Sequence, residues 1–94
     1  MVTINREMGL DHREFFRTLP AALEGRMFRV SGARIEVSAG WCQLRITLAP
    51  PAERRIGLLR LPVTRVTFEF TGGSEGEIEG FMRRFDRHYQ RGGG

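Results

Sequence analysis

The sequence offers few side chains suited to catalysis. Its one thiol is Cys42, and its two imidazoles are His12 and His88. Cys42 alternates with the apolar residues of a predicted strand, which predicts a buried and unreactive thiol. Each histidine has an aspartate one or two positions away, Asp11 or Asp86, but helical side chains at those spacings do not face one another. We therefore predict no catalytic residues and no enzymatic activity.

Two segments near the C-terminus could in principle bind an ion. Glu75, Glu77 and Glu79 would be spread around a predicted helix, so they do not converge on a cation, and acidic residues favour a helix N-terminus. The glycine-rich stretch 72–76 lacks the Gly-Lys-Ser/Thr ending of a phosphate-binding loop. A single cysteine also excludes a zinc site built from several thiolates. We predict no metal site and no cofactor.

The clearest functional signal comes from arginines that alternate with apolar residues in the middle of the chain. All 15 basic residues are arginine, and the net charge is +4. The excess lies within residues 27–70, where seven arginines stand against three glutamates. The alternation predicts an antiparallel sheet with one apolar and one polar face. The predicted partner-binding residues on the polar face are Arg29, Arg34, Trp41, Gln43, Arg45 and Arg65.

This polar face has more than one interpretation. Arginines beside an aromatic ring can hold phosphates while a base stacks on the ring. A solvated sheet face also needs polar residues, and Glu36 and Glu69 could pair with arginines across strands. Trp41 is expected off the helix-covered face, against a second chain, a ligand or the N-terminal helix. We expect a non-catalytic binding or accessory module whose arginine-rich face around Trp41 engages an acidic partner: a protein, a second copy or nucleic acid.

Periodicity and turn residues predict the elements that position this face. Asp11 is a predicted N-cap for a helix near 11–18, and Pro20 is expected to interrupt it, leaving a turn or short helix up to Leu23. Ser74 and Glu77 form a predicted capping box for a second helix over 75–90. The predicted strands are a short N-terminal piece at 2–6 and the segments 28–30, 35–37, 42–48, 56–61 and 66–70.

These elements predict an α+β fold: an antiparallel sheet of four to five strands packed on a long C-terminal helix, with a short N-terminal helix beside it. The order β-α-β4-α resembles that of TATA-binding-protein-like and helix-grip folds. The first resemblance implies DNA on the open sheet face. The second implies the alternative function of a small-ligand carrier, with a pocket between the sheet and the C-terminal helix lined by Phe81, Met82 and Phe85.

Length and composition complete the prediction. Ninety-four residues are expected to form one globular domain over 1–91, followed by a frayed glycine tail at 92–94. No apolar run approaches the roughly 20 residues that a membrane span needs. The N-terminus lacks the pattern of a signal peptide, so a cytoplasmic location without a membrane partner is expected.

Overall fold

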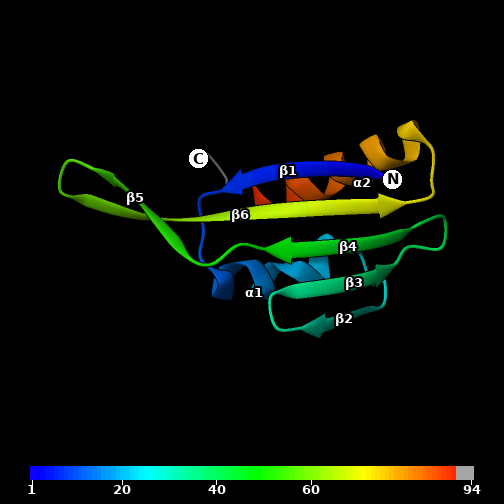
Figure 1. Cartoon of the computed structure of the whole chain (residues 1–94), viewed down its shortest axis with the longest axis horizontal. Coiled ribbons are helices and arrows are strands. Elements are labelled where there is room, and N and C mark those ends of the chain that lie inside the picture. Colours follow the sequence, from blue (N-terminus) through cyan, green and yellow to red (C-terminus); the bar gives the residue numbers. More distant parts are fainter. Residues whose placement is uncertain (91–94) are drawn as a thin grey trace.

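The computed structural model describes residues 1–90 as a sheet with two helices on one of its faces (Figure 1). The elements in chain order are β1 (Val2–Met8), α1 (His12–Ala22), β2 (Phe28–Ser31), β3 (Arg34–Ser38), β4 (Gln43–Leu48), β5 (Ala52–Ile56), β6 (Leu59–Thr71) and α2 (Glu75–Tyr89). The predicted α+β class with an antiparallel sheet is confirmed, although the sheet has six strands. Arg91 and the predicted tail at 92–94 lie outside the described residues.

The sheet has a body of five strands and one appendage. The body follows the order β1-β6-β4-β3-β2, and all neighbours are antiparallel. β6 pairs with β1 and β4 from Thr64 onward, whereas its first five residues pair with β5 alone. β5 and the start of β6 therefore form a hairpin over residues 52–63, here called the arm, which extends beyond the body at the left of Figure 1.

The strand predicted over residues 56–61 is wrong, because these residues form the end of the arm. Ile56 pairs with Leu59, so Gly57 and Leu58 make a two-residue loop. Gly57 has a φ of 60°, and glycine at the first loop position is typical of the type II′ turn that suits a hairpin. Pro62 was predicted to close a strand but lies inside β6. A two-stranded arm tolerates it because backbone groups at its outer edges have no strand partner.

The core lies between the sheet and the two helices. Alternate residues of β3, β4 and β6 point into it, and the longest side chains there are aromatic: the Phe85 ring of α2 lies 5.0 Å from the Phe68 ring of β6. The predicted capping box of α2 is confirmed. Ser74 Oγ accepts from Glu77 N at 3.1 Å, and Glu77 Oε1 accepts from Ser74 N at 2.8 Å.

α1 is one continuous helix, so the predicted interruption at Pro20 is wrong. Its N-cap is confirmed, since Asp11 Oδ1 accepts from Glu14 N at 2.8 Å. Pro20 is exposed, while Phe15 and Leu19 are fully buried. Burial of the apolar stripe outweighs the helical hydrogen bond that proline cannot donate. α1 lies on the same sheet face as α2, which leaves the opposite face open (Figure 1).

Candidate interaction surface: the open sheet face

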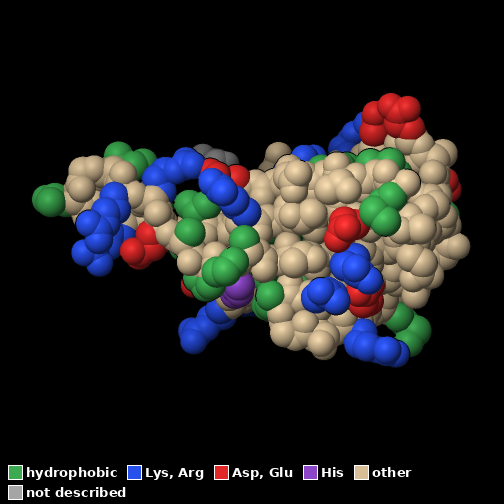
Figure 2. Space-filling model, in the orientation of Figure 1, with side chains coloured by type: hydrophobic (Ala, Val, Ile, Leu, Met, Phe, Trp, Pro, Cys, Tyr) green, Lys and Arg blue, Asp and Glu red, His purple; other side chains and the backbone are tan. Residues whose placement is uncertain are grey.

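The open face is formed by the side chains of β1, β2, β3, β4 and β6 that point away from both helices. Within residues 1–90 no helix lies over it, and Figures 1 and 2 view the molecule from this side. Five of the six predicted partner-binding residues lie on this face with exposed side chains: Arg29, Arg34, Gln43, Arg45 and Arg65. The structure therefore places these five residues on one sheet face, and their role in binding a partner stays a prediction.

Acidic residues are interleaved with the arginines. The strand register aligns a row of four residues across β2, β3, β4 and β6: Arg29, Glu36, Arg45 and Glu69. Arg45 Nε donates to Glu36 Oε1 at 2.9 Å. Both side chains are about half exposed, so this pair stabilises the fold by no more than about 1 kcal/mol. Figure 2 accordingly shows basic and acidic side chains side by side instead of a continuous basic surface.

The arginines of the open face that have no ion pair within residues 1–90 lie on β2, at one edge of the sheet, and on the adjacent β3. Arg29 and Arg34 are exposed, and neither has an ion pair within residues 1–90. Arg65 is 80% exposed, and its Nε lies 3.8 Å from Glu7 Oε2. Glu7 also forms an ion pair with Arg54 of the arm. Arg29 and Arg34 are therefore the arginines of the face with the least intramolecular compensation.

Trp41 does not lie on the open face, which corrects the sequence prediction. Its ring stacks on Phe70 at 6.4 Å and contacts Phe81 of α2 edge-on at 6.3 Å, so it belongs to the helix-covered side. β4 begins only at Gln43, and Gly40 turns the chain with a φ of 90°, so strand alternation does not extend back to residue 41. Gly73 packs against the ring, since a Cβ there would lie 2.6 Å from Trp41 Cε3.

The side chains considered for catalysis have structural contacts. Cys42 is 7% exposed, and burial raises the pKa of its thiol, with a further contribution from Glu77, so the reactive thiolate is disfavoured. His12 Nε2 lies 2.8 Å from the Ala49 carbonyl oxygen, to which it can only donate. His88 Nε2 lies 3.9 Å from Glu24.

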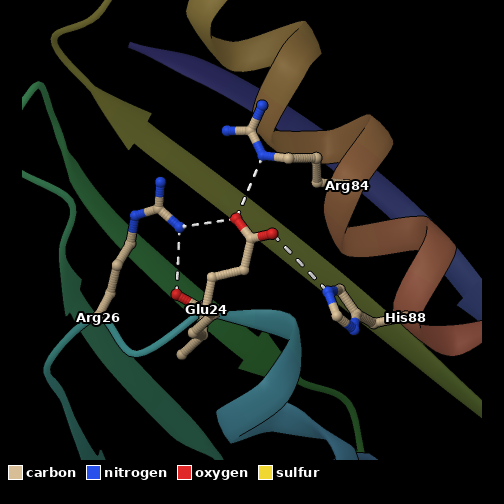
Figure 3. A network of polar contacts seen from close by, with 5 residues as sticks. Glu24, Arg26, Arg84 and His88 are labelled. Atoms are coloured by element: carbon tan, nitrogen blue, oxygen red, sulfur yellow. Dashed lines mark hydrogen bonds and ion pairs between the residues drawn. The ribbon is translucent and has the colours of Figure 1, made fainter.

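Glu24 connects the end of α1 to α2. Its carboxylate accepts from Arg84 Nε at 3.2 Å, lies 3.5 Å from Arg26, and faces His88 (Figure 3). Partial desolvation acts to raise the pKa of Glu24, but Arg84 and Arg26 outweigh it and hold the pKa below its usual value. Glu24 has a φ of 53°, a left-handed conformation unusual for a residue with a side chain. These contacts lie on the helix side, away from the open face.

The two segments that were considered and rejected as ion-binding sites have structural roles. Across the part of the chain that the structure describes, no three His, Cys, Asp or Glu side chains gather as a metal site would require. Glu75 and Glu77 lie in the first turn of α2, where negative charge is favourable. Gly72 and Gly73 have positive φ values and form the turn from β6 into α2.

The residues proposed to line a ligand pocket are packed in the core. Phe81, Met82 and Phe85 are each at most 3% exposed, and the Phe81 ring lies 5.7 Å from that of Phe70 and 5.9 Å from that of Phe85. These contacts occupy the space between sheet and helix that the small-ligand carrier would need. That alternative stays a prediction without a supporting observation.

Sequence reasoning missed the arm. Leu58 is fully exposed, and Ile56 and Leu59 are more than half exposed. Figure 2 shows hydrophobic side chains at the tip of the arm and again where it joins the body. Gly57 is a residue that a two-residue hairpin loop favours, so the sequence did contain a signal for this turn. The apolar residues Leu58 and Leu59 that follow it are more typical of a strand, and they led to the wrong prediction.

Comparisons with protein-family models, with curated proteins and with solved structures find no match for this chain. No helix within residues 1–90 combines the length and the apolar character that crossing a membrane requires.

Proposed function

We propose that the chain is a non-catalytic binding module, acting in the cytoplasm, whose open sheet face engages an acidic segment of a partner protein. The observation that carries this proposal is the placement of both helices on one side of the sheet. It leaves Arg29 and Arg34 exposed, without ion-pair partners among the described residues. An acidic segment would supply the carboxylates that these guanidinium groups lack, as bidentate pairs.

A protein partner suits this face better than nucleic acid does. In a TATA-binding-protein-like arrangement the open face binds DNA, and arginines would neutralise the phosphates. Here Glu36 and Glu69 alternate with arginines across neighbouring strands, and Glu7 lies directly across from Arg65. A continuous phosphate backbone would be repelled at each of these carboxylates, whereas a polypeptide can match a face of mixed charge. Trp41 is not available for base stacking, since Phe70 and Phe81 cover it.

The test compares two double variants that remove the same charge. Arg29→Gln/Arg34→Gln removes two arginines from the open face, and Arg83→Gln/Arg87→Gln removes two exposed arginines from α2. A glutamate-rich peptide is titrated into each protein, and arginine Nε–H NMR signals are followed. We expect the Arg29 and Arg34 signals to move in the wild type, and the first variant to bind about 10-fold more weakly, because each exposed pair contributes up to about 1 kcal/mol.

Three outcomes contradict the proposal. The two variants lose equal affinity, which would mean binding by net charge alone. The peptide does not bind. Duplex DNA binds more tightly than the peptide and depends on Arg29 and Arg34, which would assign the face to nucleic acid.

A further inference from the structure

No other part of residues 1–90 covers the arm. β5 pairs with β6 alone, and every residue from Ala52 to Leu61 is exposed. Within residues 1–90, its ion pair with the body joins Arg54 to Glu7. A two-stranded hairpin is marginal by itself in water, and an exposed contiguous apolar surface marks an interaction site. The arm therefore has the composition of a surface that is covered in an assembly.

The two faces of the arm differ in charge. Residues paired across the strands point to the same side, so one face carries five apolar residues together with Arg54: Ala52, Ile56, Leu59, Leu61 and Val63. Arg54 is the one charged residue of this face, and it forms an ion pair with Glu7. The opposite face places Arg55 directly across from Arg60, and neither has an ion pair within the described residues. The apolar face, whose one arginine is ion-paired, can therefore meet its own copy with less repulsion than the face that carries Arg55 and Arg60.

The two ends of the arm differ in form. The tip carries Leu58, which is 103% exposed. The base borders an open cleft of about 470 Å³, lined by four apolar residues, Ala49, Pro50, Ala52 and Val63, and four charged ones, Glu7, Glu53, Arg54 and Arg65. The arm is five residue pairs long, or about 17 Å at the usual strand rise. A second arm laid antiparallel on the first therefore brings its tip over the cleft.

We propose that two copies of this chain associate through their arms, packed apolar face to apolar face and antiparallel about a two-fold axis, so that Leu58 of each copy fills the cleft at the base of the other arm. A two-fold contact requires one patch to meet itself, and a largely apolar face can do so. Antiparallel alignment places each tip over the cleft of the other copy, whereas parallel alignment would place tip on tip and leave both clefts uncovered.

An edge-to-edge pairing of arms is less suited to this chain. Pro62 has no N–H, so one edge of the arm cannot form a continuous ladder with another strand. Nucleic acid is less suited as well, because the one arginine of the apolar face is ion-paired, while Arg55 and Arg60 lie on the other side. The proposal does not depend on the proposed function, since Arg29 and Arg34 lie on the body and not on the arm.

The first test measures association of the full chain by sedimentation equilibrium, from low micromolar to near-millimolar concentration. We expect a reversible dimer, which Leu58→Asp weakens about 30-fold or more, because each dimer loses both leucines that fill the clefts. Met27→Asp is the matched control, because Met27 is 83% exposed and precedes β2 on the body. Both side chains are largely in solvent, so both variants should fold, which circular dichroism checks.

The second test reports the geometry without a substitution. Labelled and unlabelled chains are mixed, and isotope-filtered NOEs are recorded from the Leu58 methyl groups. We expect NOEs to the methyl groups of Ala49 and Ala52 in the other copy. The proposal is overturned by a monomer at all concentrations, by equal dimerisation of Leu58→Asp, by loss of the dimer in Met27→Asp, or by a dimer whose Leu58 methyl groups show no NOE to Ala49 or Ala52 of the other copy. A monomer that binds duplex DNA through the arm overturns it too.

Discussion

The body of the sheet and its arm have the same local structure but opposite environments. In both, apolar residues alternate along antiparallel strands. In the body, Ile46 and Phe68 are fully buried because α1 and α2 cover their side of the sheet. In the arm, Leu59 and Leu61 are 62% and 42% exposed because nothing in the described chain covers them. Alternation therefore identifies the apolar face of a strand, whereas burial depends on the element packed against that face.

The largest expected effect separates the two regions by stability. We expect Phe68→Ala to lower the free energy of unfolding by about 3–5 kcal/mol, because it leaves a cavity beneath α2. Leu59→Ala in the arm should change it by no more than about 0.5 kcal/mol, as for exposed positions. Urea denaturation of both variants at low protein concentration, where chains are monomeric, provides the measurement. A cost of several kcal/mol for Leu59→Ala would show that the arm is packed within one chain.

A second pair of substitutions compares one turn of the body with the turn of the arm. Gly73 and Gly57 both have positive φ values, so alanine costs about 1–2 kcal/mol at either. At Gly73 the added Cβ would also collide with the Trp41 ring, and such overpacking costs about 1–3 kcal/mol more. We expect Gly73→Ala to be the more damaging variant and to shift Trp41 emission to the red, while Gly57→Ala leaves that emission unchanged. Equal losses, or an unmoved emission maximum, would contradict the packing of Trp41.

A smaller effect concerns the ionic contacts of the body. The folded-state pKa of Glu24 is lowered, so its contribution to stability is complete above the ordinary carboxyl value of 4.5 and is lost as the pH falls through the lower folded-state pKa. As the pH falls from neutral to below 4.5, we expect Glu24→Gln to lose less of its free energy of unfolding than the wild type does. Urea denaturation at a series of pH values provides the measurement. Glu79→Gln, at an exposed position of α2, is the control. If the free energy of unfolding depends on pH in the same way for all three proteins, the ion pairs of Glu24 do not contribute to stability.

The sequence predicted the body well because local signals there agree with the tertiary structure. The capping residues Asp11 and Ser74 mark the helix starts, and strand alternation places Arg29, Arg34 and Arg45 on one face. The prediction failed where a distant contact decides. Trp41 lies on the helix-covered side of the sheet, where it packs against Gly73 and Phe81. Both residues are distant in sequence and come close only in the folded chain.

Proline and apolar residues were misleading for related reasons. Pro20 was expected to end a helix, but burial of Phe15 and Leu19 holds the helix together across it. Leu58 and Leu59 were assigned to a strand because apolar residues usually occupy covered positions, and in the arm they do not. The same exposed apolar residues make the arm, which is not part of the predicted site, suited to association.

The most direct test of the contrast between body and arm is hydrogen exchange of the wild-type chain at low and high protein concentration. We predict that backbone amides of the body, such as that of Phe68, exchange slowly at both concentrations. The arm amides of residues 52–63 should exchange rapidly in dilute solution and become protected as the concentration rises. Arm amides already protected in dilute solution, or equally rapid at high concentration, would contradict the account.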